Sequence, residues 1–116
     1  MADQILFLGW NRSVTGREQQ ALKVFEKGME FFDKLQADGR IESFEPALLS
    51  AHGGDLNGFI ILRGDAGKLA KVRQDDTFIN ILMEAEYCLE GFGLITGFIG
   101  EGLTDLFARY SELISG

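Results

Sequence analysis

The fold of this chain follows from residues 58–65, which read GFIILRGD. Four large apolar residues stand in a row there, turn-forming residues flank them, and a helical pattern begins at Ala66. A strand with one wet face alternates apolar and polar residues, so an unbroken apolar run is typical of a central strand that is covered on both faces. Residues 4–10 (QILFLGW) have the same character and predict another central strand.

The segment after the first strand has the periodicity of a long amphipathic helix. Its large apolar residues recur at intervals of three and four, which predicts a helix near residues 16–37. The residues of this expected inner face are Leu22, Phe25, Met29, Phe32 and Leu35. Thr15 and Glu18 have the spacing of a capping box, with Thr15 accepting from a free backbone N–H and Glu18 reaching back to the Thr15 N–H.

A second helical pattern covers residues 66–88. Asp65 is suited to be its N-cap, and the polar segment 74–77 predicts either one bent helix or two short helices, with an aspartate capping the second part. We expect the inner side of that second part to carry Phe78, Ile79, Leu82, Met83 and Tyr87.

Two further strands and a terminal helix complete the pattern. Residues 41–51 predict a strand that lies at a sheet edge or carries a bulge, because Pro46 cannot donate to a ladder. Residues 91–99 (GFGLITGFI) predict the fourth strand, and an amphipathic helix follows between Leu103 and Ile114. The order β-α-β-β-α-β is that of a ferredoxin-like α+β fold, a four-stranded antiparallel sheet with both main helices on one face. A single domain of 116 residues is expected.

Composition narrows the class of partner. The chain has 18 acidic and 11 basic residues and a net charge of −7, which argues against nucleic acid or an anionic membrane as partner. Its longest uncharged stretch, residues 91–100, is too short for a membrane span. With one Cys and one His we expect neither a disulfide nor a metal site. We expect Cys88 to be a buried thiol and, since no signal peptide is visible, a cytoplasmic location.

The second face of the predicted sheet needs a cover of its own. Three strands are apolar on both faces, but the two main helices can cover only one of them. We therefore expect a homodimer in which the uncovered faces pack together. Ile61→Glu should then separate the subunits if Ile61 faces the partner, and unfold the chain if it faces the helices. The alternative is that the terminal helix folds back over its own sheet.

The element order, the edge strand with Pro46 and the break at residues 75–78 resemble the dimeric α+β barrel superfamily. In that superfamily two ferredoxin-like sheets close face to face. Its members include small monooxygenases, muconolactone isomerase-like enzymes, haem-degrading and stress-responsive proteins. Haem-degrading members use an Asn on the first strand and a His on the second helix. Asn11 is similar to the first, but no His stands between Ala66 and Leu89, so the resemblance implies no haem, and no cofactor is expected.

Polar and aromatic residues at strand ends are the candidate site residues. We predict a ligand cavity lined by Trp10, Arg63 and Thr96, with Asn11 or His52 at its mouth. Trp10 suits stacking on a flat ligand, or else packing in a core or dimer interface. The guanidinium of Arg63 suits an anionic group, or else an ion pair with a neighbouring carboxylate. His52 is the candidate general base, with an exposed loop histidine as the alternative.

Glu45, on the strand with Pro46, is a further candidate acid or base if it is buried. Two functions follow from these residues. The first is a dimeric protein that binds a small apolar or aromatic ligand in the barrel without catalysis. The second is a cofactor-independent monooxygenase or isomerase acting on an aromatic or lactone-type substrate.

Overall fold

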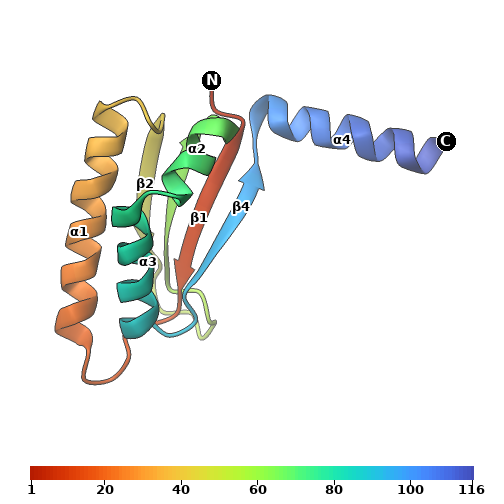
Figure 1. Ribbon diagram of the computed structural model, residues 1–116. Coiled ribbons are helices and arrows are strands. Elements are labelled where there is room, and N and C mark those ends of the chain that lie inside the picture. The colour runs from red at the N-terminus through yellow and green to blue at the C-terminus, as the bar shows by residue number, and fades with distance from the viewer.

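The computed structural model describes residues 1–116 and has two main layers, a sheet and the helices on one of its faces (Figure 1). The elements are β1 (Gln4–Trp10), α1 (Glu18–Ala37), β2 (Ser43–Leu48), β3 (Gly58–Gly64), α2 (Ala66–Arg73), α3 (Asp76–Cys88), β4 (Gly93–Phe98) and α4 (Gly100–Ser115). All neighbouring strands are antiparallel, in the order β2-β3-β1-β4. The predicted ferredoxin-like α+β fold is confirmed, and residues 66–88 form two helices in series.

The register of β1 separates its side chains cleanly between the two faces. Leu6 lies opposite Leu62 of β3 and Thr96 of β4, and Phe7 lies opposite Ile61 and Ile95. Directly opposed residues share a face, and successive residues alternate between faces. The face of Leu6 is buried under the helices, whereas the face of Phe7 has no layer over it. We call this second side the open face.

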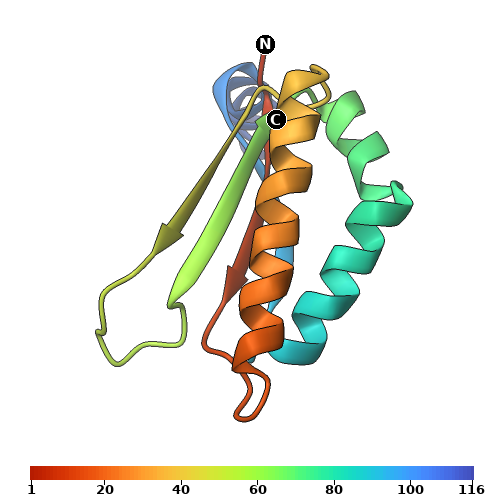
Figure 2. The same ribbon diagram turned by 90° about the vertical axis from the view of Figure 1, so that its left-hand side faces the viewer.

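The core lies between the sheet and the helices, which Figure 2 shows packed along one side. Phe32 of α1 is fully buried and packs against Phe44 of β2 and Phe78 of α3, with ring centroids 5.9 Å and 6.3 Å away. Leu69 and Val72 of α2 bury the end of the sheet beside them. Pro46 sits in the edge strand β2, as its missing N–H requires.

α1 begins two residues after the predicted start, and the predicted capping box does not form. The helix begins at Glu18 with Arg17 as N-cap and no side-chain cap bond, and Glu18 Oε1 accepts from the backbone N–H of Gly16 at 2.9 Å. Thr15 lies before the helix because the preceding loop is held elsewhere, with the Val14 N–H donating to the Cys88 carbonyl at 2.9 Å. Leu22 is also wrongly assigned to the inner face, since it is 60% exposed.

The predicted inner face of α3 is also partly wrong. Asp75 caps the helix, and its buried residues are Phe78, Ile81, Ala85 and Cys88. The expected inner residues Ile79, Met83 and Tyr87 are exposed. Two apolar stripes run along this helix, and packing against α1 and the sheet selects the one with the smaller side chains.

α4 stands apart from the rest of the molecule (Figure 1). It projects from the end of β4 on the side opposite α1 and α3, and none of its residues is buried. The alternative in which this helix covers its own sheet is therefore wrong for the single chain. None of the helices combines the length and the apolar character that crossing a bilayer requires.

Asp75 links the cap of α3 to α1 through Arg40, which predicts a pH effect. Its Oδ1 accepts from the backbone N–H of Thr77 at 2.8 Å, and its Oδ2 accepts from Arg40 at 3.1 Å. Burial by itself raises the pKa of Asp75, but the Arg40 guanidinium and the backbone donors outweigh it, so the pKa lies below its ordinary value of 3.8. A lowered pKa stabilises the fold above the unfolded-state pKa, and the stabilisation is lost as pH falls through the folded-state pKa.

We therefore expect Asp75→Asn to lower the free energy of unfolding at pH 7 and to match the wild type at pH values below the folded-state pKa. Asn retains the N-cap, so the change isolates the carboxylate. Asp75→Ala, which removes the cap as well, should cost a further ~1 kcal/mol. Urea denaturation between pH 2 and 7 measures all three. An equal deficit of the Asn variant at every pH would contradict this account.

Candidate functional site

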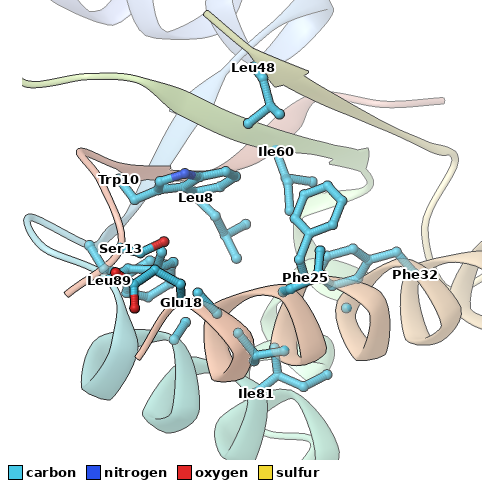
Figure 3. Close-up of a pocket in the computed structure, with 16 residues that line it drawn as sticks. Leu8, Trp10, Ser13, Glu18, Phe25, Phe32, Leu48, Ile60, Ile81 and Leu89 are labelled. Carbon is cyan, nitrogen blue, oxygen red and sulfur yellow. The ribbon is translucent and has the colours of Figure 1, made fainter. Parts of the chain in front are cut away.

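An apolar cavity lies between the helical face of the sheet and the helices α1 and α3 (Figure 3). Its volume is about 460 Å³, and 13 of its 16 lining residues are hydrophobic. Both values are typical of pockets that bind small molecules. The sequence predicted a cavity inside the barrel, on the other side of the sheet. The cavity seen in the single chain is a different one and lies under its own helices.

Small residues at one end of the helical layer create this space. Ala21 and Gly28 of α1 and Ala85 of α3 line the cavity where large side chains would otherwise fill it. At the other end Phe32 and Phe78 hold the helices away from the sheet. The aromatic residues therefore act as spacers, and the space beside the small residues stays open.

Trp10 forms one wall of the cavity at the end of β1. It lies opposite Gly58 of β3, and its indole packs directly over that glycine. A Cβ at position 58 would lie 2.6 Å from a ring carbon, so only glycine accommodates the ring there. Phe25 of α1 meets the indole edge to face, with centroids 6.3 Å apart. The indole gives the cavity one flat aromatic wall, and the Phe25 ring stands nearly perpendicular to it.

The polar groups of the cavity are gathered at one end. Figure 3 shows the oxygens of Ser13 and Glu18 close together beside Leu89. The Ser13 hydroxyl makes no hydrogen bond within the chain, and only Oε1 of Glu18 is used, by the Gly16 N–H. Glu18 is the only charged residue in the lining. The cavity therefore suits a neutral apolar molecule with a hydrogen-bonding group at one end and disfavours an anion.

The structure brings none of the other predicted site residues into this cavity. Arg63 lies on the open face, where its Nη1 is 3.3 Å from Glu45 Oε1. Thr96 lies on the helical face but accepts a hydrogen bond from Arg73 of α2 at 2.8 Å, outside the cavity. The prediction that Trp10, Arg63 and Thr96 share one cavity is therefore wrong. Trp10 lies opposite Gly58, so these two positions share a face of the sheet. Arg63 is five residues after Gly58 on β3, and because successive side chains of a strand alternate between faces, Arg63 points to the other face.

Asn11 and His52 hold loops at the end of the sheet. Asn11 Oδ1 accepts from the side chain of Asn57, and its backbone N–H donates to Glu90. His52 is exposed, with Nε2 2.7 Å from the Leu56 carbonyl and Nδ1 accepting from the Gly54 N–H at 3.1 Å. Both ring nitrogens of His52 are therefore engaged within its own loop. Of the two interpretations of His52, a general base or an exposed loop histidine, the structure agrees with the second.

Cys88 is buried, as its apolar surroundings predicted. Burial raises the pKa of the Cys88 thiol, and the nearby Glu84 carboxylate acts in the same direction. The Sγ donates to the Glu84 carbonyl at 3.0 Å. The thiolate is thus suppressed at neutral pH. The chain holds no group of three or more His, Cys, Asp or Glu residues arranged to bind a metal ion.

The sequence interpretation missed Ser13, Glu18 and the small residues of α1 and α3. The capping-box interpretation took up the Glu18 side chain, but the helix starts two residues later, and the second carboxylate oxygen of Glu18 is free at the cavity. The available signal was the presence of Ala21, Gly28 and Ala85 at helical spacing among large apolar residues. Such an interruption on a buried helix face marks a place where packing is incomplete.

Comparison with known proteins gives a match in structure alone. No protein-family model and no curated protein sequence matches the chain. A hydroxynitrile lyase from Passiflora edulis is 8% identical with a TM-score of 0.65, covering 87% of this chain and 97% of its own. A dimeric ferredoxin-like protein of unknown function from Thermobifida fusca is 12% identical with a TM-score of 0.62, covering 85% and 93%.

SnoaB, a cofactor-independent oxygenase from Streptomyces nogalater, is 17% identical with a TM-score of 0.50, covering 85% of this chain and 93% of its own. At these identities the likeness concerns the fold, since one fold carries many functions. Similar structures are described as dimeric ferredoxin-like proteins, among them one from Jannaschia sp. CCS1 with a TM-score of 0.63. The resemblance expected from the order of elements is thus confirmed: this chain has the ferredoxin-like fold that occurs in these dimeric proteins.

Proposed function

We propose that the protein binds a small, neutral, flat apolar ligand in the cavity between its sheet and helices. The observation that carries this proposal is the cavity of about 460 Å³, whose lining is apolar apart from a single polar end. An aromatic ligand fits the flat wall formed by the Trp10 indole. A hydroxyl on that ligand would donate to Glu18 and accept from Ser13, which are the polar side chains of the lining.

The binding test uses Trp10, the only tryptophan, as the reporter. Titration with N-phenyl-1-naphthylamine should quench the fluorescence of Trp10 and give saturable binding. We expect Ala21→Phe, which places a ring in the cavity, to weaken binding at least about tenfold. Ala70→Phe on the exposed side of α2 is the matched control and should bind like the wild type. Absence of saturable binding, or an unchanged affinity in Ala21→Phe, would refute the proposal.

The polar end gives a second measurement on the same site. 2-Naphthol should bind about tenfold more tightly than naphthalene, because a hydrogen bond to a charged group adds affinity. Glu18→Gln should reduce that preference without changing the affinity for naphthalene. Equal affinities of the two compounds for the wild type would contradict the role given to Glu18 and Ser13 and leave the apolar cavity itself in place.

A second candidate is a cofactor-independent oxygenase, and the free carboxylate oxygen of Glu18 favours it. A carboxylate at the end of an apolar cavity is placed to accept the proton of a ligand hydroxyl, and molecular oxygen would then oxidise the resulting anion. SnoaB, which has this fold, is such an oxygenase. Oxygen uptake with 1,4-dihydroxynaphthalene should exceed the background rate in the wild type and return to it in Glu18→Gln. Equal rates of oxygen uptake in the wild type and Glu18→Gln would contradict the oxygenase proposal and would not affect the proposal of ligand binding.

We also propose that two copies pair through the open faces of their sheets. Phe7 stacks on Phe59 there, with ring centroids 5.3 Å apart, and Ile95 is 62% exposed beside them. Covering this face removes on the order of several hundred Å² of apolar surface per chain from water, at roughly 25 cal/mol per Å². A two-fold symmetric pair is the commonest way to do so.

A further inference from the structure

We propose that α4 is an exchanged arm, whose apolar stripe packs on the second copy of the chain once the open faces have paired. This inference rests on the proposed dimer and adds to it the contact that the projecting helix makes. We define the stripe by its residues, which are Leu103, Leu106, Phe107, Tyr110, Leu113 and Ile114. They recur at intervals of three and four, so they form one side of the helix.

The stripe is not used within its own chain. Exposure rises along the helix, from 40% at Leu103 to 76% at Leu113 and 71% at Ile114. The rest of the chain therefore shields Leu103 and Leu106 in part and leaves the end of the helix open to solvent. Six such side chains leave on the order of several hundred Å² of apolar surface in water, a large part of the ~800 Å² that each partner buries in a typical stable interface.

The direction of α4 is fixed by its own chain, so its projection is built into the fold. The Ile99 N–H donates to the Asp3 carbonyl at 3.1 Å, and Gly100 turns the chain with a φ of +54°. The first turn of α4 then sits directly on the N-terminal segment, where a Cβ at Gly102 would lie 2.2 Å from the Asp3 carbonyl oxygen. Glycine at position 102 is what allows this close approach.

That direction carries the helix toward the place where a second copy would lie. α4 projects on the side of the open face, as Figure 1 shows. Its 16 residues span about 24 Å, whereas paired sheets lie about 10 Å apart. More than half of the helix therefore extends past the partner's sheet layer and alongside the partner. The radius of gyration of the single chain, 15.9 Å, against about 13 Å for a compact domain of this size, reflects the same projection.

The similar structures leave part of this chain unmatched. The four similar structures match over 93% or more of their own lengths but over only 84 to 87% of this chain. The unmatched share is close to the length of α4, which has 16 of the 116 residues.

The charge of α4 also favours a second copy over a membrane surface. Its polar side carries Glu101, Asp105 and Glu112 against the single Arg109. A helix that lies on an anionic bilayer carries Lys and Arg on its polar side. An apolar stripe with an acidic polar side instead suits an apolar protein surface.

The test is hydrogen exchange of residues 100–115 in the full-length chain at concentrations above and below the dimer dissociation constant, with light scattering to report the mass. We expect the α4 amides to be protected in the dimer and to exchange at least tenfold faster in the monomer. Protection that does not depend on concentration would mean that α4 folds onto its own chain. Rapid exchange of α4 in a stable dimer would mean that another partner is its target. Either result overturns the inference, and the second leaves the sheet-face dimer intact.

Two variants test the stripe and its direction separately. Leu113→Glu should raise the dimer dissociation constant at least about 100-fold, because each dimer would bury two unpaired carboxylates. Gly102→Ala keeps the stripe but should change the direction of α4. We expect it to raise the dimer dissociation constant at least about tenfold. Glu112→Gln on the polar side is the matched control and should dimerise like the wild type. Unchanged dimerisation of both test variants would refute the arm exchange, and a monomeric wild type would refute it together with the proposed dimer.

Discussion

Ile61→Glu is expected to convert the dimer into folded monomers, raising the dissociation constant by at least about 10³-fold. Ile61 is on the open face, opposite Phe7 of β1 and Glu45 of β2. In a two-fold pair the substitution buries two unpaired carboxylates, each beside the existing carboxylate of Glu45. The core beneath the helices does not contain Ile61, so the monomer should keep its secondary structure. Light scattering coupled to size exclusion, together with circular dichroism, measures both quantities.

The neighbouring position supplies the matched comparison. Ile60 is 5% exposed and belongs to the core under the helices, so Ile60→Glu should unfold the chain. Two identical substitutions one residue apart thus have different outcomes, because the side chains of a strand alternate between faces. Ile61→Lys, placed opposite Glu45, should also separate the subunits while it disturbs the monomer less. An Ile61→Glu protein that unfolds, or one that stays dimeric, would contradict the proposed interface.

Phe32→Ala is expected to lower the free energy of unfolding by about 3–5 kcal/mol. The Phe32 ring is fully buried and packs against the rings of Phe31, Phe44 and Phe78. The contacts among these four rings have centroid distances of 5.9 to 6.4 Å. Its removal leaves a hole, and it also removes the spacer that holds α1 away from the sheet. Urea denaturation measures the loss, at one fixed protein concentration because dimerisation contributes to stability.

Phe31→Ala is the control for this substitution. Phe31 directly precedes Phe32 on the same helix and is only partly buried, so its loss should cost clearly less than that of Phe32. The two variants should also differ in ligand binding, because Phe32 lines the cavity and Phe31 does not. A Phe32→Ala protein that loses less than about 1.5 kcal/mol would show that the layer collapses without strain and that the ring is not a spacer.

Local sequence patterns determined most of the fold. Residues 4–10 and 58–63 are apolar on both faces, and this alone placed them at the centre of the sheet. Pro46 predicted an edge strand or a bulge, Asp65 marked the start of α2, and the aspartates at 75 and 76 marked the start of α3, where Asp75 is the cap. These features act through backbone hydrogen bonding and side-chain alternation within a few residues. The sequence therefore predicted them without any knowledge of distant contacts.

The tertiary structure alone decided where the site lies. From the sequence, Trp10, Arg63 and Thr96 were predicted to line one cavity. The sheet register instead places Arg63 on the open face, and Arg73 of α2 donates a hydrogen bond to Thr96. The cavity depends on how far Phe32 and Phe78 separate the helices from the sheet, which is a balance of side-chain volumes on different elements. No local pattern contains that balance.

The buried face of α3 and the direction of α4 were decided in the same way. α3 has two apolar stripes, and its contacts with α1 and the sheet select the stripe of Phe78, Ile81 and Ala85. The spacing of apolar residues predicted an amphipathic terminal helix, yet the course of α4 is fixed by contact between Gly102 and Asp3, which are far apart in the chain. Propensity and periodicity define an element and its apolar side, but contacts between distant residues determine where that side points.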